Sequence, residues 1–232
     1  MSTDALYHPP LMPHLLVEGL NRYNDEPCLF LGDKVASYRE VRETTSRMVQ
    51  ALQSKGLGVG SRVAVISANR PEVLSNIAAM QLAGCIGTPL HPLGSLEDHA
   101  YVLEAAEIDT LVYDASVFEA HAAALQERVP ALRNLLGFGP TAAGDDYLAL
   151  ADSFEPQPLV APDVLPDDVS SVNFTGGTTG KPKGVMSTYS VTAYMTQIQM
   201  AEWEFPEELR MLIATPLSHA AAAFFIPVLQ NG

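Results

Sequence analysis

Residues 173–185 read Asn-Phe-Thr-Gly-Gly-Thr-Thr-Gly-Lys-Pro-Lys-Gly-Val and continue a strand-like run that begins at Val169. Glycines let successive backbone N–H groups converge on one anion, because no Cβ stands in the way. The hydroxyl groups of Thr175, Thr178 and Thr179 add donors and can also reach a Mg²⁺ held by the same phosphates. The stretch therefore predicts a loop that binds a phosphate group at the end of a strand.

Lys181 and Lys183 are two of the four lysines in a chain whose formal net charge is -14. An ammonium group neutralises a polyphosphate without demanding one fixed geometry, so Lys183 is the expected source of positive charge. The pattern is not the common nucleotide loop, which needs G-x-x-x-x-G-K followed by Ser or Thr, because Pro182 follows Lys181. The alternative interpretation is a Gly/Thr hairpin turn whose two lysines are solvated.

The same stretch resembles the phosphate-binding signature of the adenylate-forming enzymes, a superfamily that includes acyl-CoA synthetases, firefly luciferase and the adenylation domains of peptide synthetases. Its usual form is Tyr-[Ser/Thr]-[Ser/Thr/Gly]-Gly-[Ser/Thr]-Thr-Gly-x-Pro-Lys-Gly. Phe174 replaces the customary tyrosine, and Gly176 replaces the commoner hydroxyl residue. The first change is mild, whereas the second removes one candidate phosphate donor.

Three other segments extend the resemblance over nearly the whole chain. Residues 36–41 (Ala-Ser-Tyr-Arg-Glu-Val) and 82–92 (Leu-Ala-Gly-Cys-Ile-Gly-Thr-Pro-Leu-His-Pro) look like scaffold segments of the family. Residues 216–219 (Pro-Leu-Ser-His) look like the segment whose histidine lines the path between the carboxylate site and the adenylate. The resemblance implies that His219 is a catalytic residue, although a lone histidine at a helix start is more often a packing residue.

The resemblance also implies a reaction and its site. A carboxylic acid and ATP give an acyl-adenylate and pyrophosphate, and the acyl group then passes to coenzyme A; catalysis is mostly positioning and charge neutralisation. The implied phosphate-binding residues are Thr175, Gly176, Gly177, Thr178, Thr179, Gly180 and Lys183, with Thr175 also near Mg²⁺. The upstream segments favour an acid–thiol ligase of the fatty-acid–CoA type. An adenylation enzyme that loads a carrier protein and a non-catalytic nucleotide-binding or interaction module are the alternatives.

Several later motifs of the family are missing from the 232 residues. These are a Tyr-Gly-x-Thr-Glu segment, a ribose-binding aspartate, a hinge and a C-terminal lid domain with its catalytic lysine. We therefore expect residues 1–232 to be a truncated part of the N-terminal AMP-binding domain that lacks full catalysis by itself. Within it, the proline-rich segment 155–168 is expected to be a surface connector before the phosphate loop, since it is unsuited to a helix or a central strand.

Apolar patterning predicts alternating strands and helices. Capping residues and hydrophobic spacing place helices at 12–23, from the Ser37 cap to Leu52, at 71–81, after Ser95, at 117–128 and after Ser187 or Thr188 to Trp203. Strands are expected at 28–31, 35–38, 62–67, 83–90, 109–114, 135–138, 169–174 and 210–215. This alternation predicts an α/β domain with a largely parallel sheet.

Composition narrows the class of protein. With 47% hydrophobic and 17% charged residues, the chain has the make-up of a globular protein. The negative net charge argues against a nucleic-acid partner. Two isolated cysteines, an N-terminus unlike a signal peptide, and the lack of an apolar run of about 18 residues favour a cytoplasmic protein without a transmembrane segment. A small carboxylic acid is the expected partner, and a homodimer is left open.

Five further histidines are interpreted as surface or packing residues: His8, His14, His91, His99 and His121.

Overall fold

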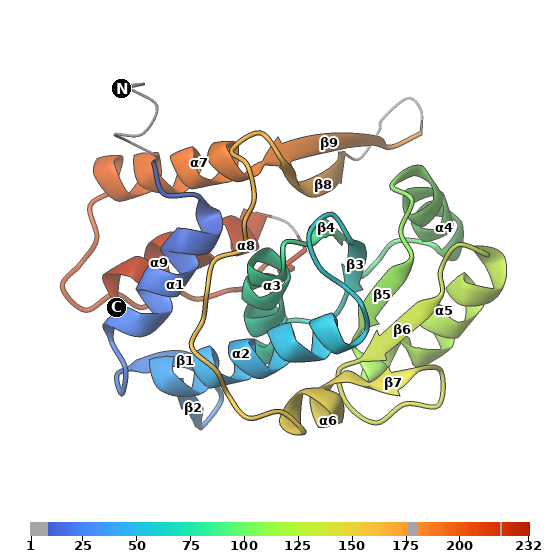
Figure 1. Cartoon of the computed structure of the whole chain (residues 1–232), viewed down its shortest axis with the longest axis horizontal. Coiled ribbons are helices and arrows are strands. Elements are labelled where there is room, and N and C mark those ends of the chain that lie inside the picture. Colours follow the sequence, from blue (N-terminus) through green and yellow to red (C-terminus); the bar gives the residue numbers. More distant parts are fainter. Residues whose placement is uncertain (1–8, 176–180, 219) are drawn as a thin grey trace.

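A computed structural model describes residues 9–175, 181–218 and 220–232 (Figure 1). Its helices are α1 (Met12–Arg22), α2 (Tyr38–Ser54), α3 (Pro71–Ala83), α4 (Leu96–Ala105), α5 (Ala115–Arg128), α6 (Tyr147–Asp152), α7 (Tyr189–Glu202), α8 (Ala220–Ala223) and α9 (Phe225–Asn231). Its strands are β1 (Pro27–Leu31), β2 (Lys34–Ser37), β3 (Arg62–Ile66), β4 (Ile86–Pro89), β5 (Thr110–Tyr113), β6 (Asn134–Gly137), β7 (Asp145–Asp146), β8 (Val169–Thr175) and β9 (Lys183–Thr188).

Seven strands form one sheet in the order β7-β6-β5-β3-β4-β8-β9. The pairs from β7 to β8 are parallel, and β9 returns antiparallel to β8 at one edge. Strands β1 and β2 form a separate antiparallel hairpin. The predicted α/β fold with a largely parallel sheet is therefore confirmed.

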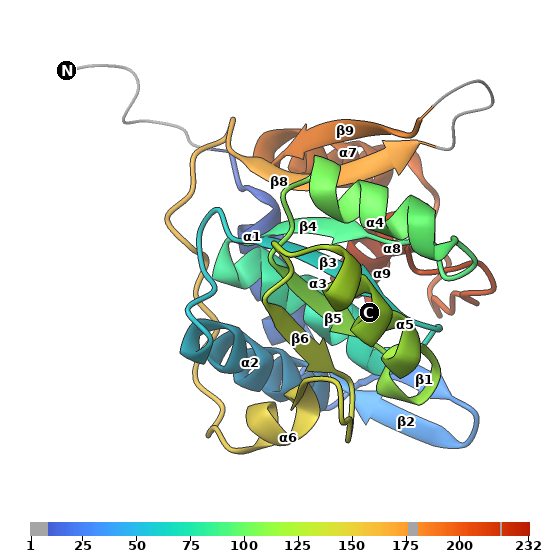
Figure 2. The same ribbon diagram turned by 90° about the vertical axis from the view of Figure 1, so that its right-hand side faces the viewer.

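Helices pack on both faces of this sheet (Figures 1 and 2). Because successive strand residues point to opposite faces, Val63 and Val112 join one hydrophobic cluster while Ala64 and Leu111 join another. The first cluster also takes in residues of α1, α2, α3, α7 and α9, and the second takes in residues of α4 and α5. The central strands thus contribute to two cores at once.

Local sequence signals account for many of the element boundaries. Ser37 and Glu40 form the expected capping box at the start of α2, and Ser95 and Asp98 form another at the start of α4. Gly32 adopts a φ of 58° in the two-residue turn between β1 and β2, a conformation that glycine reaches without a Cβ penalty. These devices are short-range, so the sequence alone was sufficient to predict them.

Strand β9 was not anticipated from the sequence. It pairs with β8 so that Thr175 lies opposite Lys183 and Phe174 lies opposite Gly184. Residues 183–188 (Lys-Gly-Val-Met-Ser-Thr) lack the regular polar–apolar alternation of a half-buried strand, so the pattern gives little signal. The geometry of a hairpin, which the alternative interpretation assumed, is therefore present around the glycine-rich stretch.

The strand predicted at 210–215 is wrong. These residues have neither helix nor strand assignment, and Leu212 is exposed. An apolar extended segment becomes a strand only when a neighbouring strand supplies ladder hydrogen bonds. In this segment the Thr215 carbonyl instead accepts a hydrogen bond from the Asn69 side chain.

The segment 155–168 has no helix or strand, and its first residues contact α2. Ser46 of α2 exchanges two hydrogen bonds with the backbone of Gln157, at 2.8 and 2.7 Å. Gln50 donates to the Glu155 carbonyl at 2.8 Å. Side chains of α2 thus satisfy backbone groups that this irregular segment would otherwise leave unpaired.

Helices α1 and α9 pack side by side although they are far apart in the sequence (Figure 1). Arg22 and Tyr23 each donate to the Gln230 carbonyl, at 3.0 and 3.2 Å. The buried hydroxyl of Tyr38 donates to the Leu229 carbonyl at 3.1 Å. The carbonyls near the end of α9, which have no intrahelical partner, are therefore bonded by side chains from the start of the chain.

Candidate functional site

The glycine-rich stretch connects the two antiparallel strands β8 and β9. Thr175 is the last residue of β8 and Lys183 is the first of β9, and the Thr175 hydroxyl lies 3.4 Å from the Lys183 carbonyl. Both residues are exposed. The strand pairing thus holds the two ends of the predicted phosphate loop within one strand spacing of each other.

Thr175 lies at the carboxyl end of β8, whose neighbour β4 runs parallel to it. The carboxyl ends of β3, β4 and β5 meet at the same edge, because these strands are also parallel. Ligands of open α/β sheets usually bind outside the carboxyl ends of the strands. The loop is therefore placed where this class of fold binds small molecules.

Gly184 gives the hairpin the space that the Phe174 ring needs. A Cβ at Gly184 would lie 2.9 Å from Val172 Cγ1 and 3.2 Å from Phe174 Cζ, closer than packed carbon atoms allow. The backbone of Gly184 is not among the glycines with positive φ. The glycine of the Pro-Lys-Gly sequence is therefore required for its lack of a side chain rather than for an unusual backbone conformation.

The two lysines of the stretch have different surroundings. The Lys181 ammonium lies 5.1 Å from the ring centroid of Tyr101, a cation–π contact. None of the ion pairs among the described residues involves Lys183, which stands exposed at the start of β9. Lys183 is accordingly the better placed of the two to meet an added anion.

Asn69 holds the segment that leads to His219. It follows β3, and its side chain donates to the Thr215 carbonyl at 2.9 Å and accepts from the Leu217 N–H at 3.0 Å. This two-point clamp brings residues 215–217 to the carboxyl edge of the sheet. Asn69 has no recognisable signal in the sequence, because its partners lie 146 and 148 residues away.

A charged network lies at the same edge. Arg70 pairs with Glu72 at 2.9 Å and with Asp114 at 3.0 Å, and it also donates to the Phe138 carbonyl at 3.2 Å. The hydrogen bond to Glu72 raises the pKa of the Arg70 guanidinium. Burial opposes ionisation of Glu72, but the hydrogen bond and charge of Arg70, the backbone N–H of Glu72 and the charge of Lys34 together hold the pKa of that carboxyl below its ordinary value. One guanidinium thus bridges two carboxylates and a backbone carbonyl, and the network ties together the segments that follow β3, β5 and β6.

Among the predicted site residues, the structure describes Thr175 and Lys183 and brings them together. Gly176, Gly177, Thr178, Thr179, Gly180 and His219 lie outside the described residues. The sequence analysis also missed Tyr101, which reaches the hairpin from α4. Only its aromatic character could have signalled this, and that does not distinguish it from a core residue.

The donor set at the hairpin fits a magnesium ion that is held mainly by phosphate. The described residues contain no group of three or more His, Cys, Asp or Glu side chains that could bind a metal by themselves. Mg²⁺ commonly keeps several waters and takes one or two protein ligands beside phosphate oxygens. The exposed Thr175 hydroxyl donates a long hydrogen bond of 3.4 Å to the Lys183 carbonyl, and its oxygen can serve as such a ligand.

Comparison with solved structures defines the class of protein first. The anthranilate CoA ligase AuaEII, solved with anthranoyl-AMP, matches with a TM-score of 0.87 and 19% identity over 100% of this chain and 45% of its own. The amide bond synthetase McbA from Marinactinospora thermotolerans matches with a TM-score of 0.83 and 27% identity, over 96% and 43% of the two chains. The fold is that of the N-terminal domain of adenylate-forming enzymes.

The family follows from the sequence. The chain belongs to the AMP-binding enzyme family, whose model matches residues 16–232. The medium/long-chain-fatty-acid–CoA ligase FadD8 of Mycobacterium tuberculosis is 46% identical over 237 residues, which cover 100% of this chain and 42% of the ligase. The chain thus spans about two fifths of the length of this relative. Among the described residues, the helices are too short or too polar to cross a membrane.

Proposed function

We propose that this chain provides the phosphate-binding part of a fatty-acid–CoA ligase that activates a carboxylic acid with ATP and transfers the acyl group to coenzyme A. The observation that carries the proposal is the pairing of Thr175 with Lys183 at the carboxyl edge of the sheet, in a chain of the AMP-binding family. The similarity to FadD8 favours a fatty acid as the substrate. Because the chain spans only part of such relatives, the complete reaction is proposed for a protein of full family length.

In this proposal the residues from Thr175 to Lys183 hold the β- and γ-phosphates of ATP. The Lys183 ammonium stabilises the negative charge that develops on pyrophosphate as the carboxylate oxygen of the acid attacks the α-phosphorus. Thr175 would offer one hydroxyl oxygen to Mg²⁺, which when bound would neutralise part of the triphosphate charge. The family resemblance assigns to His219, which follows in sequence the segment held by Asn69, the role of lining the path between the acid and the adenylate.

A second acceptor is supported by the range of relatives. Tyrocidine synthase 3 of Brevibacillus parabrevis is 24% identical over 93% of this chain. A peptide synthetase passes its acyl group to a carrier protein, so the same first half-reaction could precede a different second one. The acceptor therefore has to be measured separately from adenylate formation.

The test is ATP-dependent pyrophosphate release by a chimaera in which residues 1–232 replace the matching region of FadD8. Short, medium, long-chain and aromatic acids are supplied, each with and without coenzyme A. We expect release with medium- or long-chain acids and consumption of coenzyme A in the same reactions. Release without any effect of coenzyme A would favour the carrier-protein alternative. A chimaera that folds and releases no pyrophosphate with any acid would contradict the catalytic proposal and favour a binding module.

A further inference from the structure

Tyr101 is the side chain through which helix α4 contacts both ends of the β8–β9 hairpin. Its hydroxyl donates to the Pro182 carbonyl at 3.2 Å, and the Lys181 ammonium lies 5.1 Å from its ring centroid. Its ring also meets the Phe174 ring edge-on, with centroids 6.5 Å apart and an interplanar angle of 83°. Phe174 precedes Thr175 and Pro182 precedes Lys183, so these contacts fall on both sides of the proposed phosphate loop.

Helix α4 is a firm support for this side chain. Its residues Ala100, Val102 and Leu103 are buried in the cluster between α4, α5 and the sheet. On the same helix, the buried His99 lies 2.8 Å from His121 of α5. A side chain held by a packed helix is restrained more strongly than one on a loop. Tyr101 therefore connects the hairpin to a helix that is fixed in the hydrophobic core.

The His99 contacts explain how α4 is fixed. His99 Nε2 lies 2.9 Å from the His91 carbonyl, which only accepts hydrogen bonds, so Nε2 carries the proton. In the neutral ring Nδ1 is then an acceptor, and His121 Nε2 must donate to it. The chain of bonds runs from the loop after β4 through α4 to α5. It places α4 relative to the strands whose carboxyl ends form the site.

We propose that Tyr101 is a positioning residue for the phosphate site, an inference that rests on the proposed function. Its hydroxyl fixes the carbonyl of Pro182, and hence the peptide that leads into Lys183. Its ring face binds the Lys181 ammonium, which keeps that lysine turned toward α4 and leaves Lys183 to meet the triphosphate. Its ring edge restrains Phe174 next to Thr175. The two proposed phosphate-binding ends are thereby held in place before ATP arrives, which reduces the entropy lost on binding.

The test uses the 232-residue chain with Tyr101→Phe, Tyr101→Ala and the control Tyr194→Ala. Tyr194 is 51% exposed on α7, and among the described residues it makes no hydrogen bond or ring contact with Phe174, Lys181 or Pro182. Binding of Mg·ATP and of Mg·tripolyphosphate is measured by calorimetry, beside the unfolding midpoint of each ligand-free variant. Tripolyphosphate reports on the phosphate site alone, because it lacks the adenosine.

The phenylalanine variant keeps both ring contacts and loses one hydrogen bond, so we expect about threefold weaker binding of both ligands. The alanine variant loses all three contacts, so we expect roughly tenfold weaker binding or more. The control should bind within about twofold of the wild type, as expected for an exposed residue without a specific role. The partial rescue by phenylalanine separates positioning from mere folding, which the unfolding midpoint reports independently.

A second measurement does not depend on nucleotide. Trypsin cleaves after Lys183 but not after Lys181, because Pro182 follows it. If Tyr101 restrains the hairpin, Tyr101→Ala should be cut at the Lys183–Gly184 bond at least about threefold faster than the wild type, with Tyr101→Phe in between. Equal cleavage rates, or unchanged ligand affinity in Tyr101→Ala, would overturn the positioning role. A wild-type chain that binds neither ligand would instead overturn the proposed phosphate site, whatever the cleavage rates show.

Discussion

At the scale of single residues, the hairpin depends on Gly184 and Lys183 for opposite reasons. Gly184 contributes by having no side chain, since its place opposite Phe174 is filled by the aromatic ring. Lys183 contributes a charge that is not paired with any carboxylate among the described ion pairs. One residue shapes the hairpin and the other equips it for an anion, so they can be tested separately.

We expect Gly184→Ala to lower the free energy of unfolding by about 1–3 kcal/mol, because the added methyl group overpacks against Phe174 and Val172. Urea denaturation measures the loss, and hydrogen exchange of the β8 and β9 amides locates it. Gly58→Ala is the matched control, since a Cβ there would meet only the Ala83 carbonyl at 4.0 Å. Equal losses for the two variants would show that Gly184 has no special packing role.

We expect Lys183→Ala to weaken Mg·ATP binding by roughly tenfold or more, the effect of losing one charge-assisted hydrogen bond to a phosphate. Lys34→Ala removes the same charge from the β1–β2 hairpin and serves as the control. Lys181→Ala should have a smaller effect than Lys183→Ala, because Lys181 contacts Tyr101. Calorimetric titration with Mg·ATP ranks the three variants by the affinity that each one loses. A greater loss for Lys181→Ala would reverse the assignment of the two lysines.

At the scale of elements, the histidine pair links α4 to α5 in a pH-dependent way. Burial lowers the pKa of His99 and of His121 below their ordinary value of 6.5. For His99, the His91 carbonyl and the Asp98 carboxylate act in the opposite direction, while His121 and His91 add to the lowering. Both rings are therefore held neutral at pH values where free histidines are already partly protonated.

The sign of the effect on stability follows from proton uptake. Well above pH 6.5 the rings are neutral in the folded and unfolded states, and their contribution is fully present. As the pH falls through 6.5, the unfolded chain binds protons before the folded chain does, so the free energy of unfolding decreases. The decrease is at most about 1.4 kcal/mol per pH unit for each proton, and it ends once the folded-state pKa values are passed. Urea midpoints measured between pH 7.5 and pH 5 should show this decrease. His121→Gln, which keeps an N–H donor for His99, should make the profile shallower; an unchanged profile would assign the decrease to other groups.

Elements were predictable where their signals are local. The capping boxes at Ser37 and Ser95 and the glycine turn at Gly32 act within a few residues, and each was found in its expected place. Helix α5 begins at Ala115 rather than at 117, because the Asp114 side chain accepts from the Ser116 N–H and starts the helix earlier. Such capping is visible in the sequence once the strand before it has been placed.

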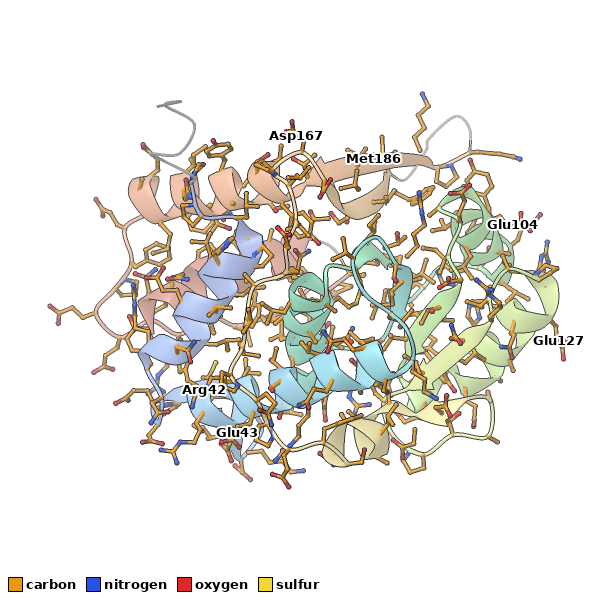
Figure 3. The ribbon with its side chains drawn as sticks, viewed as in Figure 1. Arg42, Glu43, Glu104, Glu127, Asp167 and Met186 are labelled. Carbon is orange, nitrogen blue, oxygen red and sulfur yellow. The ribbon has the colours of Figure 1, made fainter. Side chains whose placement is uncertain are left out.

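Elements and contacts that depend on distant partners were not predictable. Residues 210–215 have strand-like composition but pair with no described strand, whereas Lys183–Thr188 lacks that pattern and is a strand because β8 lies beside it. Because β9 lies at the edge of the sheet, even Met186 is 69% exposed (Figure 3). The strand therefore has no buried face that would require alternating apolar and polar residues in its sequence. The Tyr101 contact with Pro182 spans 81 residues and has no sequence signature. The phosphate-binding role of the loop could be inferred because its signal lies in consecutive residues, and it stays a prediction.

At the scale of the whole molecule, the sheet joins the two hydrophobic clusters. Leu52 of α2 is fully buried on one face and Leu125 of α5 is fully buried on the other. Because β3, β5 and β6 supply side chains to both clusters, one face cannot lose its packing without disturbing the strands that form the other. The two layers of helices therefore belong to one cooperative unit.

We expect calorimetry to show a single unfolding transition for the 232-residue chain. Leu52→Ala and Leu125→Ala should each lower the midpoint of that same transition, at a cost of about 2–5 kcal/mol for a buried leucine. Val59→Ala, at an exposed site, is the control and should shift it little. Two separate transitions, each sensitive to one variant, would mean that the faces unfold independently.

The packing of α1 against α9 has a consequence for the order of folding. The hydrogen bond from Arg22 to the Gln230 carbonyl spans 208 residues, and that from Tyr38 to the Leu229 carbonyl spans 191. During synthesis, α1 is made long before α9, so the part of its packing that α9 completes must wait until almost the entire sheet has left the ribosome. Closing so large a loop costs entropy that only the finished sheet can offset. The earliest helix of the chain is thus among the last to reach its final place, and its apolar side is open to chaperones in the meantime.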